Sequence, residues 1–319
     1  MKFPFQFSKG PSTDTITLSP LKFKPISLAD MPLINSMLQA SQSRTCDYSI
    51  GGIYMWIDYF HYEYCVVDDT LFILGRTENR PDEIAFSLPV GELPLSDAVR
   101  MIRDYCRLKN IPVVFSAVPA DRLDALLEAA GPDAVVERLD DWSDYLYDIS
   151  ALATLTGKHL MKKRNHVNRF FAENPHWRFE ALTHELLPET MLFFSGNAIG
   201  EKTDEAMALY EHDQCRRVLD SLSSYPFEGA ILRSESGEIC AFTVGEVIGD
   251  TVFCHIEKIN HEINGAGAAV NKLFAAYMLR RHPRLRYINR EEDCGDEGLR
   301  AAKLSYHPAA ILEKYNVRL

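Results

Sequence analysis

The stretch from Thr251 to Tyr306 decides the fold of this chain, and it reads TVFCHIEKINHEINGAGAAVNKLFAAYMLRRHPRLRYINREEDCGDEGLRAAKLSY. An apolar run over residues 251–259 ends in a polar turn with glycines, residues 260–267. A segment with helical periodicity follows from Ala268 to about Arg281, and a second apolar run spans residues 285–288. This order predicts a strand, a turn, a helix and a second strand. Because a helical crossover joins the two strands, we expect them to lie parallel with a right-handed connection.

Polar residues follow the second of these strands. It ends in Asn289-Arg290-Glu291-Glu292-Asp293, and a further helix is expected from near Asp296 to Ser305. Ligands of open α/β sheets bind at the carboxyl ends of the strands. We therefore expect the functional site where these two strands end.

The composition is that of an ordinary globular protein. The chain has 319 residues, of which 46% are hydrophobic and 25% are charged, and this length suits two hydrophobic cores. No apolar run approaches the roughly 18 to 20 residues that a membrane span needs. The first residues, MKFPFQFSKGPSTDT, contain no long apolar segment, so we expect no secretory signal. The net charge of −11 argues against non-specific coating of nucleic acid or anionic membranes.

Cysteine usage and the absence of motifs exclude several classes of chemistry. Seven cysteines without a C-x-x-C pair predict neither a disulfide framework nor a cysteine zinc site, and they favour a cytoplasmic location. The sequence has no G-x-S-x-G, H-E-x-x-H or Walker motif, and we expect no metal. Cys254, with His255 and Glu257, has the form of a nucleophile or metal site, but a core cysteine on a buried strand is the simpler interpretation.

The order of the predicted elements divides the chain into two similar halves near Ser150. Residues 1–150 are expected to form one domain, and residues 151–319 repeat its order of strands and helices. Asp68 and Asp69 predict a tight hairpin turn in the first half. A last strand, Ala309 to Lys314, is expected to complete the second half. The first domain has no catalytic motif, so we expect it to support the second.

The link between the halves is basic, although the protein is acidic. Residues 149–172 contain no Asp or Glu, and their periodicity predicts a helix with a cap or kink at Gly157. Three interpretations are open: this segment binds tRNA phosphates, it binds a phosphorylated or anionic small molecule, or it pairs with acidic groups of its own chain. Asparagine is a poor choice for a merely solvated helix, which favours specific recognition. The candidate binding residues are Lys158, Lys162, Lys163, Arg164, Asn165 and Asn168.

Three motifs of this chain resemble one known family. They are G-K-x-x-x-K-K-R-N-H-x-N-x-F at residues 157–170, H-I-E-K-I at residues 255–259, and Y-I-N-R-E-E-D-x-G-x-x-G-L-R-x-x-K-x-S-Y at residues 287–306. Together they are similar to the soluble catalytic region of bacterial phosphatidylglycerol lysyltransferases and to a related stand-alone family. The resemblance covers essentially the whole chain. It implies an α/β fold with mixed sheets, built from two tandem GNAT-like (acyl-CoA N-acyltransferase) domains.

The resemblance also implies an activity. The expected reaction moves an aminoacyl group from aminoacyl-tRNA, or an acyl group from acyl-CoA, to an amine or hydroxyl acceptor. A second hypothesis is a non-catalytic binding module of the same fold, which recognises RNA or an anionic metabolite through the basic segment.

Acyl transfer to an amine needs a base and donors for the oxyanion, and it needs no enzyme nucleophile. The candidate bases are the acidic residues near the two strand ends, Glu257, Glu291, Glu292 and Asp293. Carboxylates that cluster raise one another's pKa, which suits a base at neutral pH. The alternatives are an ion pair of Glu257 with Lys258 or Arg290, and a helix-capping role for Asp293.

Other polar residues of this region are candidates for substrate binding. Asn289 and Arg290 suit a carboxylate, phosphate or ribose. Arg300 and Lys303 lie about one helical turn apart, with solvated helix charge as the alternative. Tyr306 is expected either to act as an acid or to close the pocket, and a plain core tyrosine is the alternative.

The glycine turn is the candidate phosphate loop for the donor. In a GNAT-like fold, backbone N–H groups of this turn and of the next helix bind phosphate. Here the loop consists of Asn264, Gly265, Ala266 and Gly267. The nearby Glu262 disfavours the pyrophosphate of coenzyme A and favours aminoacyl-tRNA. The alternative is that the glycines only make the turn and a close helix contact.

Overall fold

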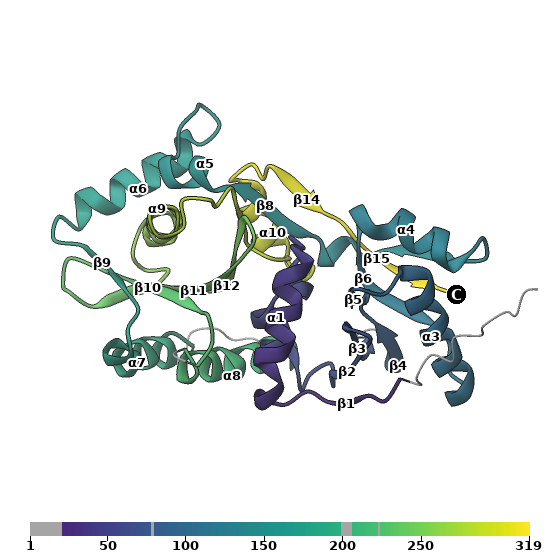
Figure 1. The fold of residues 1–319 in the computed structure, drawn as a ribbon. Helices are drawn as coiled ribbons and strands as arrows, with labels where there is room; N and C mark the ends of the chain where they lie inside the picture. The colour runs from purple at the N-terminus through teal and green to yellow at the C-terminus, as the bar shows by residue number, and fades with distance from the viewer. Residues whose placement is uncertain (1–20, 78–79, 199–205, 223) are drawn as a thin grey trace, which may run out of the picture.

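Two mixed β-sheets organise the chain in the computed structural model, which describes residues 21–77, 80–198, 206–222 and 224–319. The sheets lie side by side, each with its own helices, and α1 (Met31–Ser41) runs between them (Figure 1). Each sheet contains one parallel pair of strands among antiparallel ones. The predicted mixed α/β architecture is confirmed. In the part of the chain that the structure describes, no helix combines the length and apolar character needed to cross a bilayer.

The first sheet has the strand order β1-β2-β3-β4-β6-β15-β7, with β5 paired to β3. Its strands are β1 (Lys24–Pro25), β2 (Glu63–Val67), β3 (Thr70–Thr77), β4 (Arg80–Phe86), β5 (Val90–Gly91), β6 (Val114–Pro119), β7 (Val135–Arg138) and β15 (Lys314–Arg318). Its helices are α2 (Ile50–Trp56), α3 (Leu95–Lys109) and α4 (Ala120–Ala130). The predicted turn at Asp68 and Asp69 joins β2 to β3, and both residues have positive φ, 47° and 52°. This left-handed backbone matches the twist of the hairpin.

The second sheet has the order β14-β8-β13-β12-β11-β10-β9. Its strands are β8 (Asp144–Asp148), β9 (Arg178–Ala181), β10 (Glu228–Arg233), β11 (Ile239–Ile248), β12 (Thr251–Ile259), β13 (Tyr287–Asn289) and β14 (Ala310–Leu312). One face is covered by α5 (Ile149–Thr154), α6 (Met161–Glu173) and α9 (Ala266–Arg281), and the other by α7 (Leu187–Ala198) and α8 (Ala206–Asp220) (Figure 1). Strands β12 and β13 are parallel, as predicted. Helix α10 (Glu297–Leu304) follows β13.

The two sheets exchange strands near the ends of the expected halves. Strand β8 precedes Ser150, yet it pairs with β13 and β14 in the second sheet. The expected single strand from Ala309 to Lys314 is wrong: Glu313 separates β14 from β15, and β15 pairs with β6 and β7 in the first sheet. The end of the chain therefore crosses from one sheet to the other (Figure 1). Sequence order misplaced these strands because backbone pairing, and not position along the chain, assigns a strand to a sheet.

A common apolar core joins the halves. The largest cluster of buried side chains runs from Met31, Tyr54 and Phe72 in the first half to Cys215 and Val218 in α8. Helix α8 packs directly on α2. Burial of this apolar surface stabilises the contact between the halves.

The basic segment forms two helices with a loop between them. Helix α5 ends before Leu155, whose φ is 53°, and Gly157 has a φ of 93°. Helix α6 then starts at Met161. The expected helix is interrupted near Gly157, but Leu155 is the residue with positive φ that caps α5, and Gly157 lies in the loop before α6.

Candidate functional site

An ion pair joins the ends of the two parallel strands. Nη2 of Arg290, just after β13, lies 2.7 Å from Oε1 of Glu257 on β12. Both side chains are largely buried, with 13% and 14% of their surfaces exposed. The side-chain amide of Asn271 on α9 packs against this pair, and we assign its oxygen to the side that faces the guanidinium, where it accepts a hydrogen bond from Nη1 at 2.9 Å. Of the two alternatives for Glu257, the pair with Arg290 is the one that forms.

Helix α6 adds a second cation to this group. The Nζ atom of Lys163 lies 3.9 Å from the centre of the Tyr306 ring, and the Arg290 guanidinium lies 5.3 Å from the same centre. Burial, together with the nearby charge of Arg290, lowers the pKa of Lys163 to about 8, and Glu257 opposes this shift. Burial also raises the pKa of Tyr306 to about 12, so its hydroxyl keeps its proton at neutral pH. Two cations thus lie against one buried ring, and the carboxylate of Glu257 pairs with one of them. We call Lys163, Glu257, Asn271, Arg290 and Tyr306 the strand-end cluster.

A basic cavity of about 550 Å³ adjoins the strand-end cluster through Lys163. Among the residues that the structure describes, no carboxylate lines it, and its wall comes from the start of α6 with the loop before it and from the residues that follow α10. The rings of His159 and His307 contact each other edge to face, 5.2 Å apart. An anionic group is the chemical match for such a lining. The lining residues are Lys158, His159, Met161, Lys162, Lys163, His166, Ser305 and His307.

The remaining candidates of the basic segment have different positions. Arg164 donates hydrogen bonds to the carbonyls of Leu155 and Gly157, at 2.6 and 3.2 Å, and so fixes the loop before α6. Asn165 and Asn168 are exposed on α6, outside the cavity lining.

The other three predicted acidic residues turn toward separate partners. Oε1 of Glu291 lies 2.6 Å from Nδ1 of His255. Glu292 accepts a hydrogen bond from the thiol of Cys46 at 3.1 Å. Asp293 accepts hydrogen bonds from Arg300 and Tyr145. Because consecutive residues of a turn point in different directions, Glu291, Glu292 and Asp293 meet different partners. Of the four predicted acidic residues, only Glu257 on β12 forms an ion pair with Arg290.

Asp293 has a structural role, because it ties the end of the turn to β8 and α10. Arg300 binds it through two hydrogen bonds of 2.7 and 2.9 Å, and the hydroxyl of Tyr145 donates to it at 2.5 Å. Burial alone would raise the pKa of Asp293, but the hydrogen bonds from Arg300 and Tyr145 outweigh burial and lower it. The N-cap of α10 is Asp296, whose carboxylate accepts from the backbone of Leu299 at 2.6 Å.

Lys303 braces the same turn from α10. Its buried ammonium donates to three backbone carbonyls, those of Arg290, Glu291 and Glu292. An ammonium group has three protons, so these contacts use all of them. Arg300 also contacts Asp141, at 2.7 Å. Both basic residues of α10 are therefore engaged within the protein.

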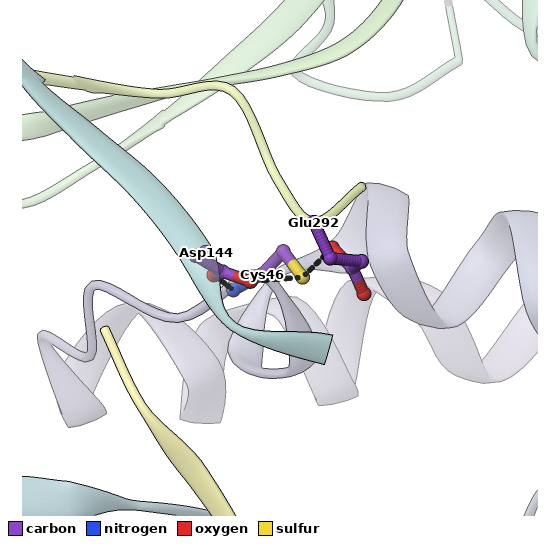
Figure 2. A group of neighbouring side chains, drawn as sticks. All are labelled: Cys46, Asp144 and Glu292. Atoms are coloured by element: carbon purple, nitrogen blue, oxygen red, sulfur yellow. Dashed lines mark hydrogen bonds between the residues drawn. The ribbon is translucent and has the colours of Figure 1, made fainter. Parts of the chain in front are cut away.

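A buried polar cluster that the sequence did not reveal lies where the halves meet. Cys46, Asp144 and Glu292 come from distant parts of the chain and face one another (Figure 2). Their donor atoms lie within 4.8 Å of one another, close enough to suggest a metal site. However, Nζ of Lys314 lies 2.7 Å from Asp144 and 3.3 Å from the sulfur of Cys46. The lysine ammonium already supplies the positive charge that these donors need.

This cluster shifts the pKa values of its members. Burial raises the pKa of Glu292 to about 7, against the opposing charge of Lys314. Burial also raises the pKa of the Cys46 thiol well above its usual range. Sequence reasoning missed Cys46, Asp144 and Lys314 because each looks like an ordinary strand or loop residue, with partners up to 268 positions away.

The glycine turn lies at the start of α9, as expected, but helix α6 packs directly against it. Gly265 has a φ of 78°, and a Cβ atom there would overlap the backbone oxygen of His166 on α6. A side chain at Gly267 would press on Ile259. Asn264 is exposed and Ala266 is buried. Close packing against α6 is therefore a sufficient reason for glycine at position 265, and phosphate binding by this loop stays a prediction.

Comparison with known proteins gives the family and the fold. Residues 38–318 match the family described as phosphatidylglycerol lysyltransferase, C-terminal. A conserved protein of unknown function from Bacteroides thetaiotaomicron is 31% identical, with a TM-score of 0.85 over 93% of this chain and 99% of that chain. No curated protein sequence matched the chain.

Two more distant structures share the fold. L-PGS from Bacillus licheniformis is 15% identical, with a TM-score of 0.65 over 92% of this chain and 91% of that chain. FemX is 10% identical, with a TM-score of 0.58 over 93% of this chain and 97% of that chain. Both share the two-sheet α/β fold of this chain, and the family and fold together support an acyltransferase-type function. The chain belongs to the family of phosphatidylglycerol lysyltransferase C-terminal regions.

Proposed function

We propose that this protein transfers an aminoacyl or acyl group from an ester or thioester donor to an amine or hydroxyl acceptor at the strand-end cluster. The observation that carries the proposal is the group formed by Glu257, Arg290 and Lys163 at the ends of two parallel strands, beside a cavity without carboxylates. Parallel strand ends are where open α/β sheets bind ligands.

Glu257 is the proposed base. The acceptor nitrogen or oxygen attacks the donor carbonyl, and its proton passes through the carboxylate to the leaving group. A new C–N or C–O bond forms, while the ester C–O or thioester C–S bond breaks. Arg290 holds the carboxylate in place by their 2.7 Å contact and adds positive charge near the developing oxyanion.

The basic cavity is the proposed site for the anionic part of the donor. Lys158, Lys162 and Lys163 line it together with histidines, which suits a phosphate or phosphodiester. The family description names a lysyl group and phosphatidylglycerol, and we extend both to this chain as a proposed aminoacyl group and acceptor. An aminoacyl-tRNA donor is preferred to acyl-CoA because Glu262 stands beside the glycine turn and His166 of α6 covers Gly265.

Label transfer from defined donors tests the proposal. The full chain is incubated with tRNA charged with radiolabelled lysine or other amino acids, and separately with labelled acyl-CoA. Acceptors are vesicles that contain phosphatidylglycerol, and soluble amines. We expect label to reach an acceptor from charged tRNA, and Glu257→Gln to lower the rate of transfer by roughly 10² to 10⁴. Glu128→Gln on α4 is the matched control, since Glu128 is exposed and lies outside the strand-end cluster and the basic cavity. Absence of transfer from every donor, with RNA binding that depends on Lys162, would favour the binding module instead.

A further inference from the structure

The turn that carries Arg290 is held by the first half of the chain. We propose that residues 44–51, the anchor segment, position this turn and thereby set the location of the Arg290 guanidinium. The catalytic consequence rests on the proposed function, but the anchoring itself does not. The first half of the chain then contributes to the geometry of the site, although no residue of the anchor segment contacts the strand-end cluster.

The first set of contacts between the turn and the anchor segment passes through the buried imidazole of His255. His255 contacts Glu291 through Nδ1, at 2.6 Å, and Glu246 through Nε2, at 2.9 Å. The backbone N–H of Gly51 donates to the same Glu246 oxygen at 2.7 Å. Both imidazole nitrogens face carboxylates, and both donate when those carboxylates are ionised. Burial alone would lower the pKa of His255, but Glu291 and Glu246 raise it to about 10.

The second set of contacts is direct. The side-chain amide of Asn289 donates to the backbone carbonyl of Arg44 at 2.7 Å, and its oxygen accepts from the backbone of Glu291 at 2.6 Å. The thiol of Cys46 donates to Glu292 at 3.1 Å (Figure 2). Three of the four residues from Asn289 to Glu292 are thus tied to the anchor segment, directly or through one ring.

The remaining residue of these four is Arg290, so the anchors flank it on both sides. Glu291 has a φ of 57°, an unfavourable backbone conformation for a residue with a side chain. Such a conformation persists only where surrounding contacts impose it. The contacts of Glu291 with His255 and Asn289 contribute to imposing it here, together with the hydrogen bond from Lys303 to the Glu291 carbonyl. Loss of these contacts is expected to let the turn relax and the guanidinium shift.

Glycine at position 51 offers a selective way to test the anchoring. A Cβ atom at Gly51 would overlap the His255 ring, so Gly51→Ala pushes the imidazole without removing a polar group. Gly196→Ala is the matched control, because Gly196 lies on α7 with no atom within 4 Å of an added Cβ. Hydrogen exchange of the amides of residues 289–293 is the first measurement, and it needs no substrate.

We expect Gly51→Ala to speed exchange in this turn by about 10-fold and Gly196→Ala to leave it unchanged. Unchanged exchange in folded Gly51→Ala protein would overturn the anchoring. Glu246→Gln is the second variant if Gly51→Ala does not fold. It keeps the size of the side chain and weakens the hydrogen bond to His255, so faster exchange is again expected, and unchanged exchange again refutes the proposal.

A double-mutant cycle then separates positioning from general loss of structure. Gly51→Ala is expected to lower kcat/KM by about 100-fold in the natural background, as a shift of roughly 1 Å does. In the Arg290→Lys background, where the guanidinium is already lost, it is expected to cost no more than about 2-fold. Equal losses in both backgrounds would refute positioning of Arg290. If no donor supports activity, the proposed function fails while the exchange experiment still decides the anchoring.

Discussion

Lys314 forms an ion pair with Asp144, with 2.7 Å between Nζ and Oδ1, and neither side chain is exposed to solvent. The lysine belongs to β15 in the first sheet, and the aspartate belongs to β8 in the second sheet. Asp47 lies 2.7 Å from the same ammonium. One buried cation therefore pairs with Asp144 of the second sheet and with Asp47, at the place where the two sheets exchange strands.

Removal of this cation is expected to destabilise the whole protein. Lys314→Met leaves the buried carboxylate of Asp144 and the partly exposed carboxylate of Asp47 without a counter-charge, so we expect the free energy of unfolding to fall by about 3 to 5 kcal/mol. Denaturation in urea measures the change. Lys22→Met is the control: this lysine is exposed, and its replacement should change stability by less than about 0.5 kcal/mol. A similarly small effect for Lys314→Met would contradict the role assigned to the ion pair.

Glu292 is expected to give stability a characteristic dependence on pH. Burial raises its pKa to about 7 in the folded protein, so between its ordinary pKa and pH 7 the folded state binds more protons than the unfolded state. Stability from this residue therefore falls as the pH rises through that window and is greatest below it. Glu292→Gln cannot titrate, and the slope of its unfolding free energy against pH should be less negative there. Urea denaturation at several pH values, compared with exposed Glu262→Gln, tests this, and equal slopes in all three proteins would refute it.

Lys163 is expected to set the pH range of donor binding. Its pKa is lowered to about 8, mainly by burial, so the ammonium loses its charge as the pH rises through that value. If this charge holds the donor phosphate, the KM for the donor rises above pH 8. Lys163→Arg stays charged and should remove the rise. Initial rates across this pH range provide the measurement, with Lys109→Arg on α3 as control. The same profile in the natural protein and in Lys163→Arg would argue against a role for this charge.

Glu257 is expected to affect the rate more than donor binding. Glu257→Gln keeps the size of the side chain but cannot accept the acceptor proton, so kcat should fall by roughly 10² to 10⁴. The KM for the donor should change little, because the carboxylate faces Arg290 and not the basic cavity. Steady-state kinetics separates the two parameters. A rise in KM with unchanged kcat would assign Glu257 to binding instead.

The local sequence pattern predicted the secondary structure around the candidate site. Residues 251–259 and 285–288 were expected as parallel strands, and β12 and β13 are parallel, although β13 begins later, at Tyr287. The break at Gly157 was also expected. Spacing and side-chain periodicity are properties of neighbouring residues, so these features can be read without the fold.

The partners of the charged residues could not be read in the same way. Nothing local distinguishes Glu257, which meets Arg290, from Glu291, which meets His255. Likewise, the basic segment gave Lys162 and Lys163 equal weight, but only Lys163 was found over the Tyr306 ring. Each pairing depends on the direction of a side chain after the strands and helices have packed.

The sequence by itself determined where the candidate site lies, because chain order and polarity place polar residues at the ends of two adjacent strands. Only the tertiary structure decided what holds that site in place. The contacts of Cys46 with Glu292 and of Arg44 with Asn289 join residues about 245 positions apart. Lys314 at the end of the chain completes the same network. Such contacts leave no periodic signal, since their energy exists only after folding has brought the two halves together and excluded water from between them.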